Sequence, residues 1–64
     1  MKYVRVYYDW IEDRIYSQME TNIMTPPHLC ERWGIFCVTL EPSDKLVEEA
    51  RELWKRIGKE LLAL

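Results

Sequence analysis

The sequence has little glycine, little histidine and no long apolar run. Gly34 and Gly58 are the only glycines and His28 is the only histidine of the 64 residues. A phosphate-binding loop needs several glycines close together, so motifs of that kind are excluded. Catalysis by a histidine pair is excluded as well, and no nucleophile stands beside a base at a useful spacing. We therefore expect a protein that is not an enzyme.

Segments that direct a chain to a membrane are also missing. Lys2, Arg5 and Asp9 interrupt the early apolar residues, which excludes a secretory signal of the usual form. The longest nearly apolar run, 33–40, is far too short to cross a bilayer. The sequence predicts a cytoplasmic protein that does not enter membranes.

Side-chain amides are scarce, whereas charged residues are common. Asn22 and Gln18 are the only amides, while 31% of the residues are charged. Few amides beside many charges is typical of heat-adapted proteins, so we expect a thermophilic source. The formal net charge of −2 argues against a strongly basic nucleic-acid binder.

The chain is short enough for its stability to be a problem. Sixty-four residues predict one small domain, 1–64, whose core alone is marginal. Chains of this size usually gain stability from a partner chain, a metal or a disulfide. We expect a homo-oligomer, most simply a homodimer, and a possible disulfide between Cys30 and Cys37.

The first half of the chain predicts a strand and then an element of ambiguous type. Residues 2–8 alternate and are rich in β-branched and aromatic types, which predicts a strand. Residues 9–22 favour a helix, because apolar side chains recur every four residues and Asp9 resembles a helix cap. The alternative is a second strand, 14–20, that closes a hairpin. No Asn-Gly or other glycine turn supports that alternative.

The second half predicts a short helix, a strand and a long helix. Thr25 followed by two prolines is typical of a helix start, which predicts a helix over 26–33 that ends at Gly34. Residues 35–40, IFCVTL, predict a strand buried on both faces. An apolar stripe predicts an amphipathic helix over 44–62, capped by Ser43 or Asp44. The fold class is α+β, in the order β-α-α-β-α or alternatively β-β-α-β-α, with a two- or three-stranded sheet against the last helix.

Three residues of the zinc-ligand types lie within ten positions of one another. They are His28, Cys30 and Cys37, and Glu31 could be a fourth ligand. On a helix, residues two apart point in nearly opposite directions, so His28 and Cys30 could share one ion only if the segment were extended. The helix prediction therefore implies no metal site and no cofactor. The segment 29–35, LCERWGI, resembles the start of a helix-turn-helix motif, but a strand follows where the recognition helix is required.

Aromatic residues and a heptad spacing in the last helix suggest contact with another protein. Candidate interface residues are Tyr3, Tyr7, Trp10, Val47, Trp54 and Leu61. The alternative is that the helical stripe simply packs on the sheet. We expect a non-catalytic interaction or regulatory module that binds itself and an unidentified protein.

A nucleic-acid-associated regulator is the alternative function. Its candidate contacts are Arg5, Arg14, Arg51, Lys55 and Lys59, the last three forming a row along one side of the final helix. Glu48 and Glu52 flank this row at helical spacing, which favours a salt-bridged surface over a phosphate track.

Overall fold

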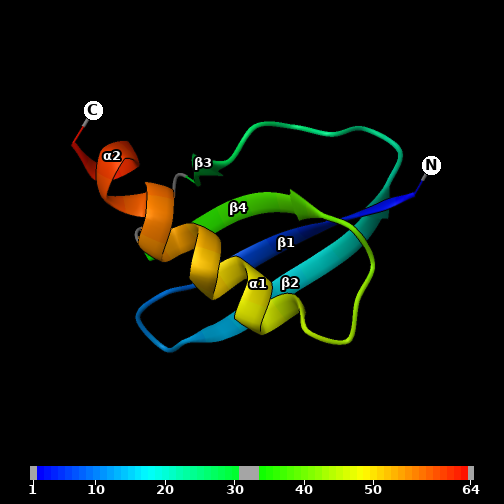
Figure 1. The fold of residues 1–64 in the computed structure, drawn as a ribbon, viewed down its shortest axis with the longest axis horizontal. Helices are drawn as coiled ribbons and strands as arrows, with labels where there is room; N and C mark the ends of the chain where they lie inside the picture. Colours follow the sequence, from blue (N-terminus) through cyan, green and yellow to red (C-terminus); the bar gives the residue numbers. More distant parts are fainter. Residues whose placement is uncertain (1, 31–33, 64) are drawn as a thin grey trace.

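A four-stranded antiparallel sheet with one C-terminal helix across one face forms the protein (Figure 1). The computed structural model describes residues 2–30 and 34–63. The strands are β1 (Tyr3–Asp9), β2 (Arg14–Thr21), β3 (His28–Leu29) and β4 (Ile35–Leu40), in the sheet order β2-β1-β4-β3. The helix runs from Leu46 to Leu62 as α1 (Leu46–Leu53), η1 (Trp54–Gly58) and α2 (Lys59–Leu62). The α+β class predicted from the sequence is confirmed.

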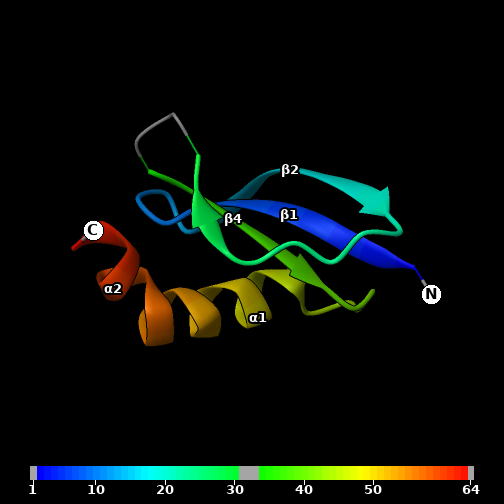
Figure 2. The ribbon, with the colours of Figure 1, turned by 90° about the horizontal axis from the view of Figure 1, so that it is seen from above.

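The core lies between the helix and the two central strands, as the view along the sheet shows (Figure 2). Alternate residues of a strand point to opposite faces, so one face of each strand supplies the core. On β1 and β4 this face carries Val4, Val6, Tyr8, Phe36, Val38 and Leu40. Leu46 and Ala50 of α1 close the core from the helix side. Every residue of β4 is buried, which confirms the prediction of a strand covered on both faces.

Residues 9–22 form a turn and a strand, so the predicted helix is wrong and the alternative hairpin is confirmed. β2 pairs antiparallel with β1, and the register shifts by one residue between Tyr7 and Tyr8. The Asp9 carboxylate accepts hydrogen bonds from the backbone N–H groups of Ile11 and Glu12, each at 3.0 Å. Asp13 supplies the left-handed residue of the turn, with φ of 56°. Asp tolerates this conformation, so the turn needs no glycine.

Residues 26–30 contain no helix and include the short strand β3, so the short helix predicted over 26–33 is also wrong in the part that the structure describes. β3 pairs antiparallel with β4, with His28 opposite Cys37 and Leu29 opposite Phe36. The backbone N–H of Cys30 donates to the carbonyl of Ile35 at 3.1 Å. Residues 31–33 of the predicted helix lie outside the described residues. Prolines suit an extended chain as well as a first helical turn, and the element order is β-β-β-β-α instead of either predicted order.

The long C-terminal helix is confirmed, although it begins two residues later than predicted. Its first turn has no side-chain cap, and Ser43 Oγ instead accepts a hydrogen bond from the N–H of Lys45 at 2.9 Å. One turn, Trp54–Gly58, widens to a π-helix. None of the helical segments in the described ranges is long and apolar enough to cross a membrane.

Candidate metal centre and neighbouring clusters

Strand pairing brings His28, Cys30 and Cys37 together on one face of the sheet. Cys37 lies between Phe36 and Val38, which face the helix, so its side chain points to the opposite face. His28 is the cross-strand partner of Cys37 on that face, and Cys30 follows His28 by two positions in extended chain. One imidazole nitrogen and the two Sγ atoms all lie within 4.8 Å of one another. The three donors converge at one point.

This convergence overturns the reason for expecting no metal site. The prediction rested on a helix, in which His28 and Cys30 point apart, whereas in an extended segment they point the same way. In this cluster Cys37 is buried, Cys30 is half-buried and His28 is exposed. The site is therefore open to solvent on the histidine side. Glu31, the fourth ligand considered from the sequence, lies outside the described residues.

Two polar side chains of β1 lie beside this cluster. Tyr7 is the cross-strand neighbour of Cys37 on β1, so Tyr7, Cys37 and His28 form a row across three strands. Arg5 precedes Tyr7 by two residues and lies on the same face. Its Nε is buried and has no hydrogen-bond partner among the described residues. A buried donor of this kind is costly unless a partner satisfies it.

Burial governs the chemistry of the two thiols. It raises the pKa of Cys30, an effect partly offset by the hydrogen bond with Cys37. It also raises the pKa of Cys37, and the neighbouring Cys30 adds to this effect while the charge of Arg5 opposes it. Thiols with a raised pKa are weak nucleophiles at neutral pH, because the thiolate is the reactive form. Both cysteines are free thiols in the structure, and the disulfide stays a prediction.

A second cluster joins the β1–β2 turn to the helix. The Tyr8 hydroxyl donates to Asp13 Oδ1 at 2.5 Å, and Arg51 donates to both Asp13 oxygens, from Nε at 2.9 Å and from its terminal nitrogen at 3.0 Å. Burial is the main cause that raises the pKa of Tyr8 to about 12. Arg51 and Tyr8 together lower the pKa of Asp13. Sequence reasoning missed this cluster, because a helical 9–22 gave Asp13 no reason to face residue 51.

Four of the six predicted interface residues pack against the core of the single chain, and the other two lie on the opposite face of the sheet. Trp10 stacks on Trp54, with ring centroids 4.0 Å apart and an angle of 15° between the ring planes. The ring of Phe36 packs against the same indole, with centroids 5.3 Å apart. Val47 and Leu61 pack against the core cluster. Tyr3 and Tyr7 are half-buried on the sheet face opposite the helix. Contact of any of these residues with another chain stays a prediction.

The cations predicted to contact nucleic acid come from β1, β2 and the helix. Arg51 is held by Asp13, and Arg5 lies beside the cysteine cluster. Arg14 is exposed on β2, while Lys55 and Lys59 are exposed on the helix. Arg51 and Lys55 both act on Asp13, the residue before Arg14, so a carboxylate lies among the cations at this point and offsets their charge.

Exposed apolar side chains gather around β2. Of the six large hydrophobic residues that are exposed in the described ranges, five lie in or beside this strand: Ile11, Tyr16, Met19, Ile23 and Met24. The sixth, Leu62, lies at the end of the helix. Ile11 is 72% exposed and Ile23 64%, so these side chains contribute little to the core. Sequence reasoning placed Ile11, Met19 and Ile23 on the buried side of a helix and so missed this surface.

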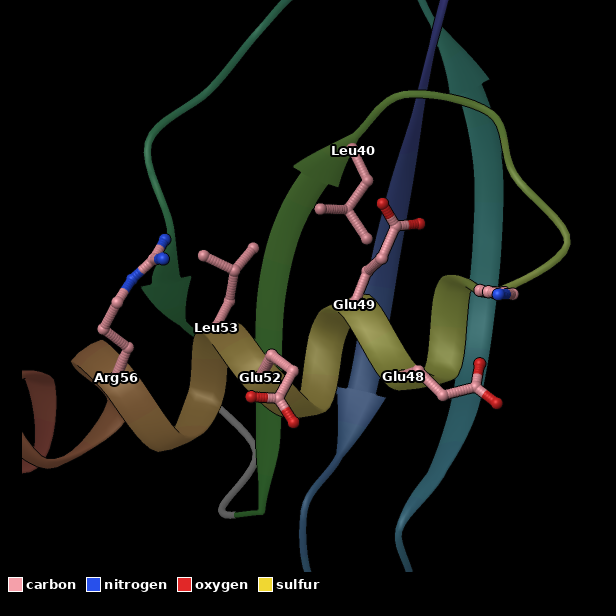
Figure 3. A pocket seen from close by; sticks show the side chains of 7 residues that line it. Leu40, Glu48, Glu49, Glu52, Leu53 and Arg56 are labelled. Atoms are coloured by element: carbon pink, nitrogen blue, oxygen red, sulfur yellow. The ribbon is translucent and has the colours of Figure 1, made fainter.

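A hollow between the helix and the end of β4 completes the set of candidate sites (Figure 3). Glu49 points toward Leu40, whereas Glu48 and Glu52 point away from it (Figure 3). Lys45, Leu53 and Arg56 complete its lining. The hollow is shallow and its carboxylates are exposed, which is typical of a solvated helix surface.

Comparison with known proteins adds no family to these observations. No family model matches the chain, and neither the curated proteins nor the solved structures give a match.

Proposed function

We propose that this protein is a small, non-catalytic interaction module that acts as a homo-oligomer through the free edge of β2. The supporting observation is the group of exposed apolar side chains on β2 and its flanking segments. β2 ends the sheet at one side, and a strand in this position offers a row of backbone donors and acceptors to another chain. Strand addition at such an edge is a recurring mode of protein recognition.

A second copy of the chain suits this edge because the strand is self-complementary when antiparallel. The residues from Ile15 to Met19 carry no charge, whereas Arg14 and Glu20 lie at opposite ends. Antiparallel pairing of two β2 strands therefore brings the end of one strand that carries Arg14 beside the end of the other that carries Glu20. Parallel pairing would bring ends of like charge together.

The apolar residues beyond the two ends of β2 fit the same arrangement. Ile11 precedes the strand and Ile23 follows it, and both are highly exposed. Antiparallel pairing centred near Ser17 brings Ile11 of one copy toward Ile23 of the other and removes both from water. Burial of apolar surface contributes about 25 cal/mol per Å².

Substitution of Met19 tests this proposal. Sedimentation of wild type should give the mass of a dimer, and Met19→Lys, which sets a charge within the uncharged stretch of the edge, should give a monomer with an unchanged far-UV spectrum. Leu62→Lys is the matched control, because it places the same charge on an exposed apolar residue away from β2. A monomeric wild type, or equal dissociation of both variants, would contradict the proposal.

The same samples separate the alternative function. Binding of DNA or RNA at low salt that weakened steeply as the salt concentration rose would favour the alternative function, a nucleic-acid-associated regulator. Association through apolar residues of β2 should change little with salt.

A further inference from the structure

We infer that Cys30, Cys37 and His28 bind one thiophilic divalent metal ion of the zinc type. The inference is independent of the β2 edge, since the cluster lies on β3 and β4 at the other side of the sheet. Two sulfurs and one imidazole nitrogen are a donor set that selects Zn²⁺ and similar ions over Mg²⁺ and Ca²⁺, which prefer oxygen.

The donor atoms lie almost as close together as the ligand atoms around a bound zinc ion. Zinc lies about 2.3 Å from sulfur and about 2.0 Å from nitrogen, so tetrahedral ligands lie about 3.3–3.8 Å from one another. The donor atoms of the cluster already lie within 4.8 Å of one another. Binding of an ion therefore requires the donor atoms to approach one another by about 1 Å.

A hydrogen bond to one ring nitrogen of His28 leaves the other nitrogen able to bind a metal ion. Nδ1 lies 3.0 Å from the carbonyl oxygen of Pro26. Because a carbonyl only accepts hydrogen bonds, Nδ1 carries the proton and Nε2 keeps its lone pair. A backbone carbonyl that holds the second ring nitrogen is the usual outer partner of a metal-binding histidine.

Two polar side chains of β1 lie beside the Cys37 sulfur. Tyr7 is the cross-strand neighbour of Cys37, and Arg5 lies two residues before Tyr7 on the same face of the sheet. A phenol O–H and a guanidinium are both groups that can donate to a metal-bound thiolate. The buried Nε of Arg5, which has no partner in the described part of the chain, is a donor that a thiolate could satisfy. Two thiolates also neutralise the charge of a divalent ion, so Arg5 does not oppose its binding.

The backbone makes the cluster rigid on two sides. Cys37 lies in a strand that is hydrogen-bonded on both edges, and Cys30 is held to Ile35 by its N–H. Three protein donors leave one coordination position, which water fills in three-ligand zinc sites. The exposed side of the cluster, at His28, is where that position meets solvent.

Titration of the reduced protein with Co²⁺, followed by displacement with Zn²⁺, tests the inference. Wild type should bind one Co²⁺ and give the strong visible bands of tetrahedral cobalt with a near-ultraviolet thiolate-to-cobalt band. Loss of an outer-shell partner costs about 10–100-fold in affinity, so Cys30→Ser, which removes a ligand, should cost more than about 100-fold. His28→Gln should weaken binding but keep the charge-transfer band, because both sulfurs remain.

Glu41→Gln is the control, since it removes an exposed carboxylate just beyond β4 and should leave the titration unchanged. Cys37→Ser changes a buried residue, so Cys30→Ser carries the test if Cys37→Ser fails to fold. Absence of the cobalt bands in reduced wild type, or equal affinities of wild type and Cys30→Ser, would overturn the inference. A mass two hydrogens lower that persists under reductant, showing a closed disulfide, would overturn it too.

Discussion

At the scale of single residues, Asp13 combines a backbone role with a side-chain role. Its left-handed backbone makes the β1–β2 turn, and its carboxylate joins Tyr8 of the core to Arg51 of the helix. The hairpin turn and the helix are thereby linked by one side chain. Arg51 binds the Asp13 carboxylate through two parallel hydrogen bonds, here called the fork, which is the strongest common geometry for such a pair.

The lowered pKa of Asp13 predicts a loss of stability in acid. The carboxyl group has a pKa below 3.8 in the folded protein and an ordinary value when unfolded. Its contribution to the free energy of unfolding is therefore present above that ordinary value and is lost as the pH falls through the folded value. Asp13→Asn should lower the melting temperature at neutral pH. The variant should also lose less stability than wild type between neutral and acid pH, because it has no carboxylate to protonate at this position.

Asn keeps the left-handed turn, because it tolerates positive φ about as well as Asp, so the variant isolates the carboxylate. Asp44→Asn, at an exposed carboxylate before the helix, is the control and should leave both properties close to wild type. Melting curves recorded from neutral to acid pH measure the effect. Identical curves for wild type and Asp13→Asn would show that the fork contributes no net stability.

At the scale of elements, the π-helical turn of the C-terminal helix begins at Trp54, whose indole packs against the core. Gly58 is buried beneath the Trp54 indole, and that indole stacks in turn on Trp10 from the β1–β2 turn. A π-turn rotates the residues that follow it relative to a regular α-helix. Glycine at position 58 gives the indole room to lie flat against the helix.

Gly58→Ala is therefore expected to destabilise the protein although alanine is the better helix former. Alanine gains about 1 kcal/mol in helix propensity. Its Cβ would overlap the Trp54 indole, and overpacking of this kind costs about 1–3 kcal/mol. We expect a lower free energy of unfolding and altered tryptophan fluorescence, as Trp54 shifts from Trp10.

Lys59→Ala, on the exposed side of the next turn, is the control and should slightly raise stability through propensity alone. Chemical denaturation followed by fluorescence measures both variants. A more stable Gly58→Ala with an unchanged emission spectrum would mean that the indole does not need the space above Gly58.

At the scale of the whole molecule, association through β2 predicts that thermal stability depends on concentration. A partner that binds only the folded chain stabilises it by mass action. The melting temperature of wild type should rise with protein concentration, whereas that of Met19→Lys should not. Calorimetry over a wide range of dilution measures this dependence, and a wild-type melting temperature that stays constant would count against assembly.

The sequence by itself determined those elements whose residue pattern fits only one type of secondary structure. The uninterrupted apolar run of β4 and the stripe of the last helix each carry enough local information to fix element type. His28, Cys30 and Cys37 were also visible in the sequence as residues of the zinc-ligand types. The region 9–22 was ambiguous, because apolar residues spaced by four fit one side of a helix, and the charged and polar residues among them fit an exposed edge strand equally well.

Only the tertiary structure decided what the ambiguous segments became. β2 is a strand because β1 offers it backbone partners, and β3 is extended because β4 does the same. Strand pairing joins residues that are distant in sequence, and no local pattern contains that information. The same pairing brings His28 and Cys30 to the same side as Cys37 and Asp13 within reach of Arg51, since side-chain direction follows from the element type that the partner strand imposes.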